Sequence, residues 1–210
     1  MGYSDQRSKI DAVVLAAGQS LRMGALKPLL PFGAKSVIST CINNLRDAGI
    51  DEIVVVVGHR ASEITQHLKD ENVAFAVNDD PQSEMGASIA RGVEAISSDA
   101  TAILISPADI PGVAAGTISS IISAWNHGAR LVIPEHEGRG GHPVLIDARF
   151  RKELLTLDHT AGLRGFFRRH LDEVLRFAVE SPYIARDLDT WDDYRRLHEE
   201  IFGLPPAKQD

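Results

Sequence analysis

The sequence lacks the features that mark several broad classes of protein. It has one cysteine in 210 residues, which excludes an internal disulfide and a cysteine-based metal cluster. No apolar run approaches the roughly 20 residues that a membrane-spanning helix needs, and residues 1–9 are polar. The 22 Lys and Arg are outnumbered by 29 Asp and Glu, and the resulting net charge of −7 argues against a nucleic-acid backbone as partner. We therefore expect a cytoplasmic protein that binds neither membrane nor nucleic acid.

The composition favours one globular domain. A chain of 210 residues can bury most of its apolar surface, and contents of 44% hydrophobic and 24% charged residues are ordinary for such a domain. We predict a single domain over residues 10–202, after the polar segment 1–9. The Pro-rich tail 203–210 is expected to be disordered. Cys41 lies in an apolar helical stretch, so we interpret it as a core residue and not as a nucleophile.

Strand and helix patterns alternate along the chain. The run 52–57 is apolar on both faces, which is typical of a parallel strand covered by helices. The alternation predicts a Rossmann-like, three-layer open sheet of mostly parallel strands, in which ligands bind at the carboxyl ends of the strands. Strands are predicted at 12–15, 52–57, 73–77, 102–106, 131–134, 144–147 and 173–179, and helices at 36–48, 61–69, 85–96, 115–127, 163–170 and 190–202.

The most informative segment is the loop 15–27, which follows the first strand. It brings together a set of glycines and polar or basic residues: Gly18, Ser20, Arg22, Gly24 and Lys27. A glycine-bearing turn that leaves a strand can direct several backbone N–H groups at one anion, and Arg and Lys add positive charge. The alternative is an ordinary basic surface loop, because the spacing matches neither Gly-x-x-x-x-Gly-Lys-Ser/Thr nor Gly-x-Gly-x-x-Gly. Its position at the carboxyl end of a strand favours the anion site.

Carboxylates occupy comparable positions elsewhere. Asp109 follows the strand 102–106 and stands between two prolines. Mg²⁺ prefers one or two carboxylates together with phosphate oxygens and water, but Asp109 is equally suited to capping the helix that follows. Near the C-terminus, Asp187 and Asp189 precede Thr190, which forms a near capping box with Asp193. These acids are candidates either for a metal site or for stabilising a helix start.

The loop resembles the signature of the MobA-like nucleotidyltransferases, roughly Leu-Ala-Ala/Gly-Gly-x-Ser-x-Arg-Met-Gly-x-x-Lys. The residues in register are Gly18, Ser20, Arg22, Met23, Gly24 and Lys27. Ala17 stands where the guanylyltransferase branch tends to carry a second glycine, so the loop is most similar to the molybdenum cofactor cytidylyltransferases. The resemblance implies a fold of the nucleotide-diphospho-sugar-transferase type. It also implies that the loop holds the triphosphate of an NTP, with Leu15, Ala16 and Ala17 towards the base.

The same resemblance assigns the carboxylates. It makes Asp109 a metal ligand and Asp189 the second one, with Asp187 as the substitute. Trp191 replaces the proline of the family pattern, and both residues suit a first helical turn.

Two further motifs match the family. Asn78, Gly86 and Ser88 fall in a segment that contacts base and ribose. A Gly-His-Pro element is implied to shape the acceptor side, where Arg139 and His142 can meet a phosphate; its residues are Arg139, Gly141, His142 and Pro143. We interpret the other seven histidines as surface residues.

Together these resemblances imply Mg²⁺-dependent transfer of CMP from CTP to molybdopterin, with release of pyrophosphate. Arg22, Lys27 and Asp109 would be the catalytic residues, and a molybdoenzyme that receives the cofactor is an expected partner. The alternatives are a GTP-dependent enzyme or one with another phosphorylated acceptor, and an accessory protein that binds nucleotide or cofactor without chemistry.

Overall fold

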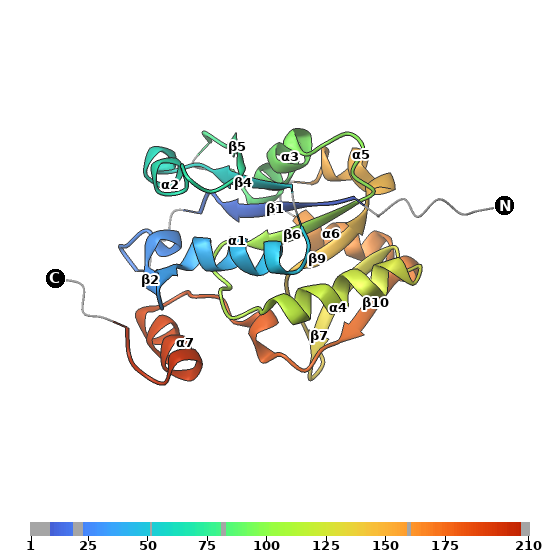
Figure 1. The fold of residues 1–210 in the computed structure, drawn as a ribbon. Coiled ribbons are helices and arrows are strands. Elements are labelled where there is room, and N and C mark those ends of the chain that lie inside the picture. The colour runs from blue at the N-terminus through green and yellow to red at the C-terminus, as the bar shows by residue number, and fades with distance from the viewer. Residues whose placement is uncertain (1–8, 19–22, 51, 81–82, 159–160, 207–210) are drawn as a thin grey trace.

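The computed structural model describes residues 9–18, 23–50, 52–80, 83–158 and 161–206. Its centre is an eight-stranded sheet in the order β10-β7-β9-β6-β1-β4-β5, with β8 paired to β7 (Figure 1). The strands are β1 Ile10–Ala16, β4 Ile53–Val57, β5 Ala74–Val77, β6 Ala102–Pro107, β7 Leu131–His136, β8 Arg139–Gly140, β9 Val144–Asp147 and β10 Val174–Ala178. The α-helices are α1 Val37–Asp47, α2 Ala61–His67, α3 Met85–Ala95, α4 Ala115–Asn126, α5 Arg151–Leu154, α6 Gly162–Arg169 and α7 Trp191–Phe202. The predicted α/β class is confirmed.

Most of the sheet is parallel, as predicted. β1 pairs in parallel with β4 and β6, β4 with β5, and β10 with β7. The exceptions are β9, which runs antiparallel to both β6 and β7, and the short strand β8, which runs antiparallel to β7. Only residues 137–143 separate β7 from β9, which is fewer than the dozen or so that a parallel crossover needs. The chain therefore turns back as a hairpin.

Helices cover both faces of the sheet because successive strand residues point to opposite sides. In β1, Ala12 and Val14 are buried in one core with side chains of α1, α2 and α4. Val13 faces the other core, which α3, α5 and α6 complete. This explains why the central strands are continuous apolar runs: successive residues of each strand point into the two different cores.

Cys41 lies in α1 and is 5% exposed, in agreement with its interpretation as a core residue. Burial raises the pKa of its thiol to about 12, and the carboxylate of Asp109 acts in the same direction. The thiol is therefore protonated at neutral pH. No helix in the described part of the chain has the length and apolar character to cross a membrane.

A third apolar cluster, here called the C-terminal cluster, lies outside the two cores that flank the sheet. It joins the segment after β1 to α7 and to the hairpin of β2 (Pro31–Phe32) and β3 (Lys35–Ser36), which the sequence patterns did not predict. Its buried members are Met23, Leu30, Phe32, Val37, Leu188, Tyr194 and Leu197. The near capping box at the start of α7 is confirmed in full, with reciprocal bonds between Thr190 and Asp193.

One histidine departs from the sequence expectation. His198 of α7 is 5% exposed and packs against Phe32, so the interpretation of all seven remaining histidines as surface residues was wrong for this one. Its Nδ1 lies 2.7 Å from the Leu204 carbonyl oxygen, and its Nε2 accepts from the Gly33 N–H at 3.4 Å. A neutral imidazole meets both groups, which is why this polar ring is tolerated in an apolar cluster.

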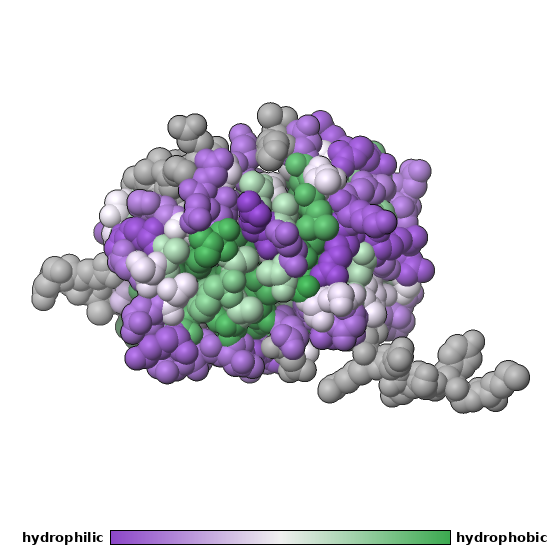
Figure 2. All heavy atoms as spheres, turned by 90° about the horizontal axis from the view of Figure 1, so that it is seen from above, coloured by the Kyte–Doolittle hydropathy of each residue, from purple (hydrophilic) through white to green (hydrophobic). Residues whose placement is uncertain are grey.

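The edge strand β5 lies beside α2 and α3 in Figure 1, and its end residues Ala74 and Val77 are exposed. Seen from above, the middle of this face is hydrophobic and its surroundings are hydrophilic (Figure 2). Val77, the last residue of β5, is 48% exposed. The other edge of the sheet is formed by β10.

The opposite end of the central strand carries a buried carboxylate. Asp11 in β1 is 1% exposed, and its Oδ2 accepts a hydrogen bond of 2.9 Å from the Ser97 N–H. Its Oδ1 has no hydrogen-bond partner among the described residues. Burial raises the pKa of Asp11, and the Ser97 hydrogen bond opposes this shift. Because the folded pKa is raised, the contribution of Asp11 to stability falls as the pH increases through that pKa.

We expect Asp11→Asn to raise the free energy of unfolding at pH 8, by about 1 kcal/mol for each unit by which the pKa is raised. The amide oxygen of Asn can still accept from Ser97, and the buried charge is gone. Thermal unfolding between pH 4.5 and 8 tests this: the gain should shrink towards pH 4.5. Asp172→Asn, at an exposed position, is the control. A variant less stable than the wild type at pH 8 would contradict the prediction.

Candidate active site at the carboxyl ends of the strands

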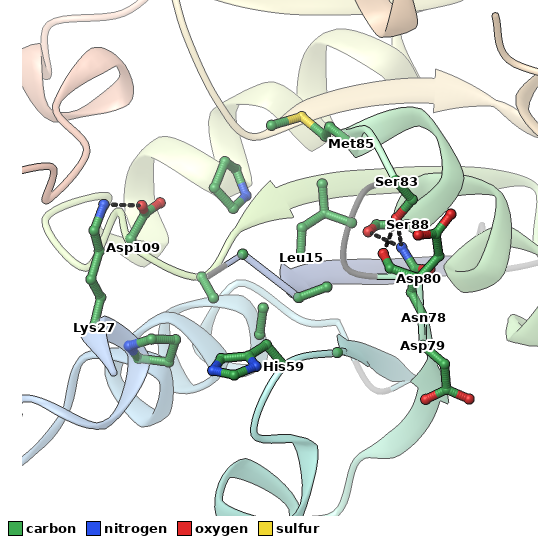
Figure 3. Close-up of a pocket in the computed structure, with 17 residues that line it drawn as sticks. Leu15, Lys27, His59, Asn78, Asp79, Asp80, Ser83, Met85, Ser88 and Asp109 are labelled. Atoms are coloured by element: carbon green, nitrogen blue, oxygen red, sulfur yellow. Dashed lines mark hydrogen bonds and ion pairs between the residues drawn. The ribbon is translucent and has the colours of Figure 1, made fainter. Parts of the chain in front are cut away.

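A cavity of about 690 Å³ opens at the carboxyl ends of β1, β4, β5 and β6 (Figure 3). This is the edge at which ligands bind in open α/β sheets. β1 lies between β4 and β6, so the loop that leaves it is at the centre of the cavity floor. The lining residues are Leu15, Ala16, Ala17, Gly18, Lys27, Pro28, Gly58, His59, Asn78, Asp79, Asp80, Ser83, Met85, Ser88, Pro107, Ala108 and Asp109.

One end of the cavity holds a buried lysine between two carboxylates. The Nζ of Lys27 lies 2.8 Å from Asp189 Oδ1 and 3.7 Å from Asp109 Oδ2. Lys27 is only 8% exposed, and Figure 3 shows its ammonium group pointing at Asp109. Such a buried ammonium depends on its partners, since an unpaired charge there would be costly.

The fold brings these groups together from distant parts of the chain. Lys27 begins the 3-10 helix η1 (Lys27–Leu29), and Asp109 follows β6. The N–H of Leu188 donates to the backbone carbonyl of Asp109 at 3.1 Å, so the residues on either side of Leu188 lie beside it. This backbone bond is what places the C-terminal carboxylates at the end of β6.

The electrostatic balance at Asp109 reflects this crowding. Burial raises its pKa, Lys27 lowers it, and the negative charges of Asp187 and Asp189 raise it again. Two carboxylates already converge on one cation, and oxygen ligands of this kind suit Mg²⁺. No group of three or more His, Cys, Asp or Glu able to hold a metal occurs among the described residues. Among the described residues, Asp109 and Asp189 are two carboxylates that could bind a divalent cation together with phosphate and water.

The other end of the cavity is polar, and Asp79 and Asp80 line it together with Asn78, Ser83 and Ser88 (Figure 3). The Nδ2 of Asn78 donates to the hydroxyls of Ser83 and Ser88, each at 2.8 Å, as Figure 3 shows. Ser83 in turn donates to the carbonyl of Asp80 at 2.7 Å. The backbone N–H of Asn78 bonds to the Val57 carbonyl at 2.8 Å, which continues the pairing of β4 and β5. These bonds fix the turn that connects β5 to α3.

The structure brings only part of the predicted nucleotide set to the cavity. Those that line it are Leu15, Ala16, Ala17, Gly18, Lys27, Asn78 and Ser88. Gly86 does not line the cavity but is buried in α3, where a Cβ on it would lie 3.4 Å from the Asp158 carbonyl oxygen. Met23 lies in the C-terminal cluster, and Gly24 has a φ of +63° that favours glycine. The predicted Ser20 and Arg22 lie outside the described residues.

The predicted acceptor residues lie beyond the cavity wall. Arg139 is exposed in β8, whereas the segment 141–143 packs on the 3-10 helix η4 (Pro182–Ala185). The N–H of His142 donates to the Ile184 carbonyl at 2.7 Å. Burial lowers the pKa of His142, and the carboxylate of Asp187 acts against this. Pro143, the last residue of the segment, is buried. Through its contact with η4, the segment 141–143 supports the chain that leads to Asp187 and Asp189.

Nine residues that line the cavity were not predicted as site residues from the sequence: Pro28, Gly58, His59, Asp79, Asp80, Ser83, Met85, Pro107 and Ala108. Gly58 and His59 directly follow the carboxyl end of β4. The rule that ligands bind at the carboxyl ends of parallel strands, which selected the loop after β1, therefore also applied to them. A Cβ on Gly58 would lie 2.9 Å from the Asn78 carbonyl oxygen and 3.0 Å from the Ala17 Cβ, which shows how closely three strand ends approach here.

Comparison with known proteins agrees with this arrangement. The family model described as "MobA-like NTP transferase domain" matches residues 12–174. The chain belongs to this family of nucleotidyltransferases. The match includes the loop after β1, the Asn78 turn and Asp109, but it ends before Asp187 and Asp189.

Individual relatives of this MobA-like protein carry different names. It is 26% identical to the molybdenum cofactor cytidylyltransferase of Escherichia coli K12 over 188 residues, which are 89% of this chain and 94% of the relative. It is 29% identical to the nicotine blue oxidoreductase of Paenarthrobacter nicotinovorans over 199 residues, covering 90% and 96%.

Among solved structures, Rv0371c from Mycobacterium tuberculosis H37Rv superposes with a TM-score of 0.82 at 30% identity, covering 91% of this chain and 98% of the other. Its complex with manganese gives a TM-score of 0.75 at 28% identity, with the same coverage.

We expect Gly141→Ala to destabilise the protein by about 2 kcal/mol or more. Its Cβ would lie 2.1 Å from the Ile184 carbonyl oxygen, and a backbone atom cannot move away as a side chain can. The adjacent Asp187–Asp189 segment should shift with it. Denaturant unfolding measures the loss. Gly116→Ala in α4, where nothing lies within 4 Å of the new Cβ, should instead be neutral or gain up to about 1 kcal/mol. Equal stability of the two variants would refute the packing argument.

Proposed function

We propose that this protein is a Mg²⁺-dependent nucleotidyltransferase that transfers CMP from CTP to molybdopterin and releases pyrophosphate. The observation that carries the proposal is the convergence of Asp109 and Asp189 on the buried Lys27, at the carboxyl ends of parallel strands. Membership of the MobA-like family and the similarity to a molybdenum cofactor cytidylyltransferase support the reaction type. The choice of CTP rests on Ala17.

The two ends of the cavity suit the two ends of a nucleotide. Lys27 can bind the β- and γ-phosphates, together with backbone N–H groups of the loop after β1 and the side chain of Arg22. The Asn78 end, with its hydroxyls and amide, offers hydrogen bonds to ribose and base. Leu15 lies between the two ends, with His59 nearby (Figure 3), and Ala16 also lines the cavity.

A divalent cation fits beside the triphosphate end. Asp109 and Asp189 would hold it, with Asp187 close by. Such a cation neutralises charge on the transferred and leaving phosphates when it is bound. The existence of a solved manganese complex of a MobA-like relative supports this assignment.

The chemistry then requires positioning more than acid–base catalysis. An oxygen of the acceptor phosphate attacks the α-phosphorus, a new phosphorus–oxygen bond forms, and the bond to the β-phosphate oxygen breaks. Lys27 stabilises the negative charge that accumulates on the leaving pyrophosphate. A phosphate monoester is largely ionised at neutral pH, so no general base is needed. The acceptor would approach from the side of Arg139, Gly141, His142 and Pro143, and a molybdoenzyme would take up the product.

The decisive experiment is pyrophosphate release from each of the four NTPs, with and without molybdopterin. The proposal expects CTP and molybdopterin to give the highest rate. A highest rate with GTP, or with another phosphorylated acceptor, would change the substrate and keep the class. No release with any pair, combined with NTP binding that is independent of Mg²⁺, would instead identify a binding protein.

In the same assay, Asp109→Asn should lower kcat/KM by about two to three orders of magnitude and leave the fold intact; Asp172→Asn should have no effect.

Lys27→Met should affect metal and nucleotide in opposite directions. The ammonium group occupies the space between the carboxylates, so its removal should tighten Mn²⁺ binding without NTP by on the order of tenfold. NTP binding should weaken by about ten- to a hundredfold, because a charge-assisted contact to phosphate is lost. Calorimetric titration with Mn²⁺ and with CTP measures both. Lys35→Met, at an exposed position in β3, is the control. A loss of both affinities would contradict the competition between Lys27 and the metal.

A further inference from the structure

Besides Asp109 at the end of β6, the triphosphate end of the cavity is built from two segments that lie outside the sheet. Met23–Lys27 is the last part of the loop after β1, and Asp187–Asp189 precedes α7. They meet in the C-terminal cluster, where Met23 is 6% exposed and Leu188 is 1% exposed. The Lys27–Asp189 ion pair connects them, and a side-chain hydrogen bond from α7 reaches the first segment: the Nε1 of Trp191 donates to the Met23 carbonyl oxygen at 3.2 Å.

We propose that Trp191 is a positioning residue that sets the spacing between the phosphate-binding loop and the carboxylate of Asp189. This rests on the proposed function. Trp191 is the first residue of α7, two positions after Asp189, and it lies beyond the part of the chain that the family model matches. It also departs from the proline that the family pattern has here, and a proline cannot donate the hydrogen bond.

The reason for a second connection follows from the charges. Lys27 now pairs with Asp109 and Asp189, but a bound triphosphate would attract its ammonium group away from them. Triphosphate binding therefore weakens the Lys27–Asp189 ion pair, although the spacing between Met23–Lys27 and Asp187–Asp189 must be kept while the nucleotide is bound. The bond from Trp191 to Met23 joins an indole N–H to a backbone carbonyl, and neither group carries a charge. It is unaffected by this exchange of partners.

Packing holds the indole in place. Its ring meets Tyr194 edge-on at 5.9 Å between centroids, and Trp191 packs against the buried members of the C-terminal cluster. Tyr194 in turn donates to the Pro31 carbonyl, so α7 contacts the chain on both sides of η1. Trp191→Phe removes the donor and keeps most of the ring contacts.

The chain offers a matched control. It has two tryptophans, Trp125 and Trp191. Trp125 lies in α4, and its Nε1 has no hydrogen-bond partner among the described residues. Trp125→Phe therefore removes an indole without removing such a bond, and it leaves Trp191 as the only tryptophan in the protein.

The experiment compares the two variants in fluorescence and kinetics. In Trp125→Phe, CTP with Mg²⁺ should produce a saturable change in tryptophan emission; in Trp191→Phe, which retains Trp125, it should produce none. The KM for CTP should rise about fivefold in Trp191→Phe, as expected for the loss of one neutral hydrogen bond, with the acceptor KM and the unfolding temperature close to those of Trp125→Phe. A merely structural role would lower the unfolding temperature and leave KM unchanged.

The possible failures are distinct. If the wild type binds and converts CTP but the two variants have the same KM, the positioning role is overturned and the proposed function stands. If the wild type binds no NTP, both the positioning role and the proposed function are overturned.

Hydrogen exchange of the backbone amides of residues 24–27, without ligand, tests the connection between Trp191 and Met23 itself. Exchange should be faster in Trp191→Phe than in Trp125→Phe, and equal rates would overturn the positioning role.

Discussion

The candidate site depends on one buried interaction, the ammonium group of Lys27 held between Asp109 and Asp189. Its three members come from the loop after β1, from the end of β6 and from the segment before α7, so the interaction joins the sheet to the C-terminus. The backbone bond from Leu188 to Asp109 makes this possible. The cost of burying a lysine is offset by two carboxylates, and burial raises the pKa of Asp109 in spite of the lysine. We therefore expect that a divalent cation can replace the Lys27 ammonium group as the partner of these two carboxylates.

The fold was largely predictable because a central parallel strand has apolar residues on both sides, and β1, β4 and β6 display this in their sequences. The rule that ligands bind at carboxyl ends then selected the loop after β1 and Asp109, and it would have selected Gly58 and His59 as well. The antiparallel direction of β9 is set by the short connection from β7, which periodicity does not describe. The burial of His198 and the contact between Trp191 and Met23 depend on tertiary packing, for which no local pattern exists.

The family determines the framework of the site more firmly than its chemistry. A cytidylyltransferase and a protein named an oxidoreductase match this chain over similar lengths and at similar identity. The residues that would distinguish a transferase are those proposed here to bind a polyanion and a cation, and two of them, Asp187 and Asp189, lie beyond the matched range. Function in this family has to be argued from such residues, since the sheet and its helices are common to relatives with different names.

The balance of charge gives the final reason to expect a metal. At this end of the site, among the described residues, Asp109 and Asp189 pair with one lysine and Asp187 lies near Asp109, and yet the proposed substrate is a triphosphate. A triphosphate alone would be repelled by Asp109, Asp187 and Asp189, and it would also compete with them for Lys27. A divalent cation held by Asp109 and Asp189 would resolve both conflicts, because it would neutralise carboxylate and phosphate charge and would leave Lys27 to the leaving group. Metal and nucleotide are therefore expected to bind cooperatively, and the spacing of the two walls must persist while Lys27 changes partners.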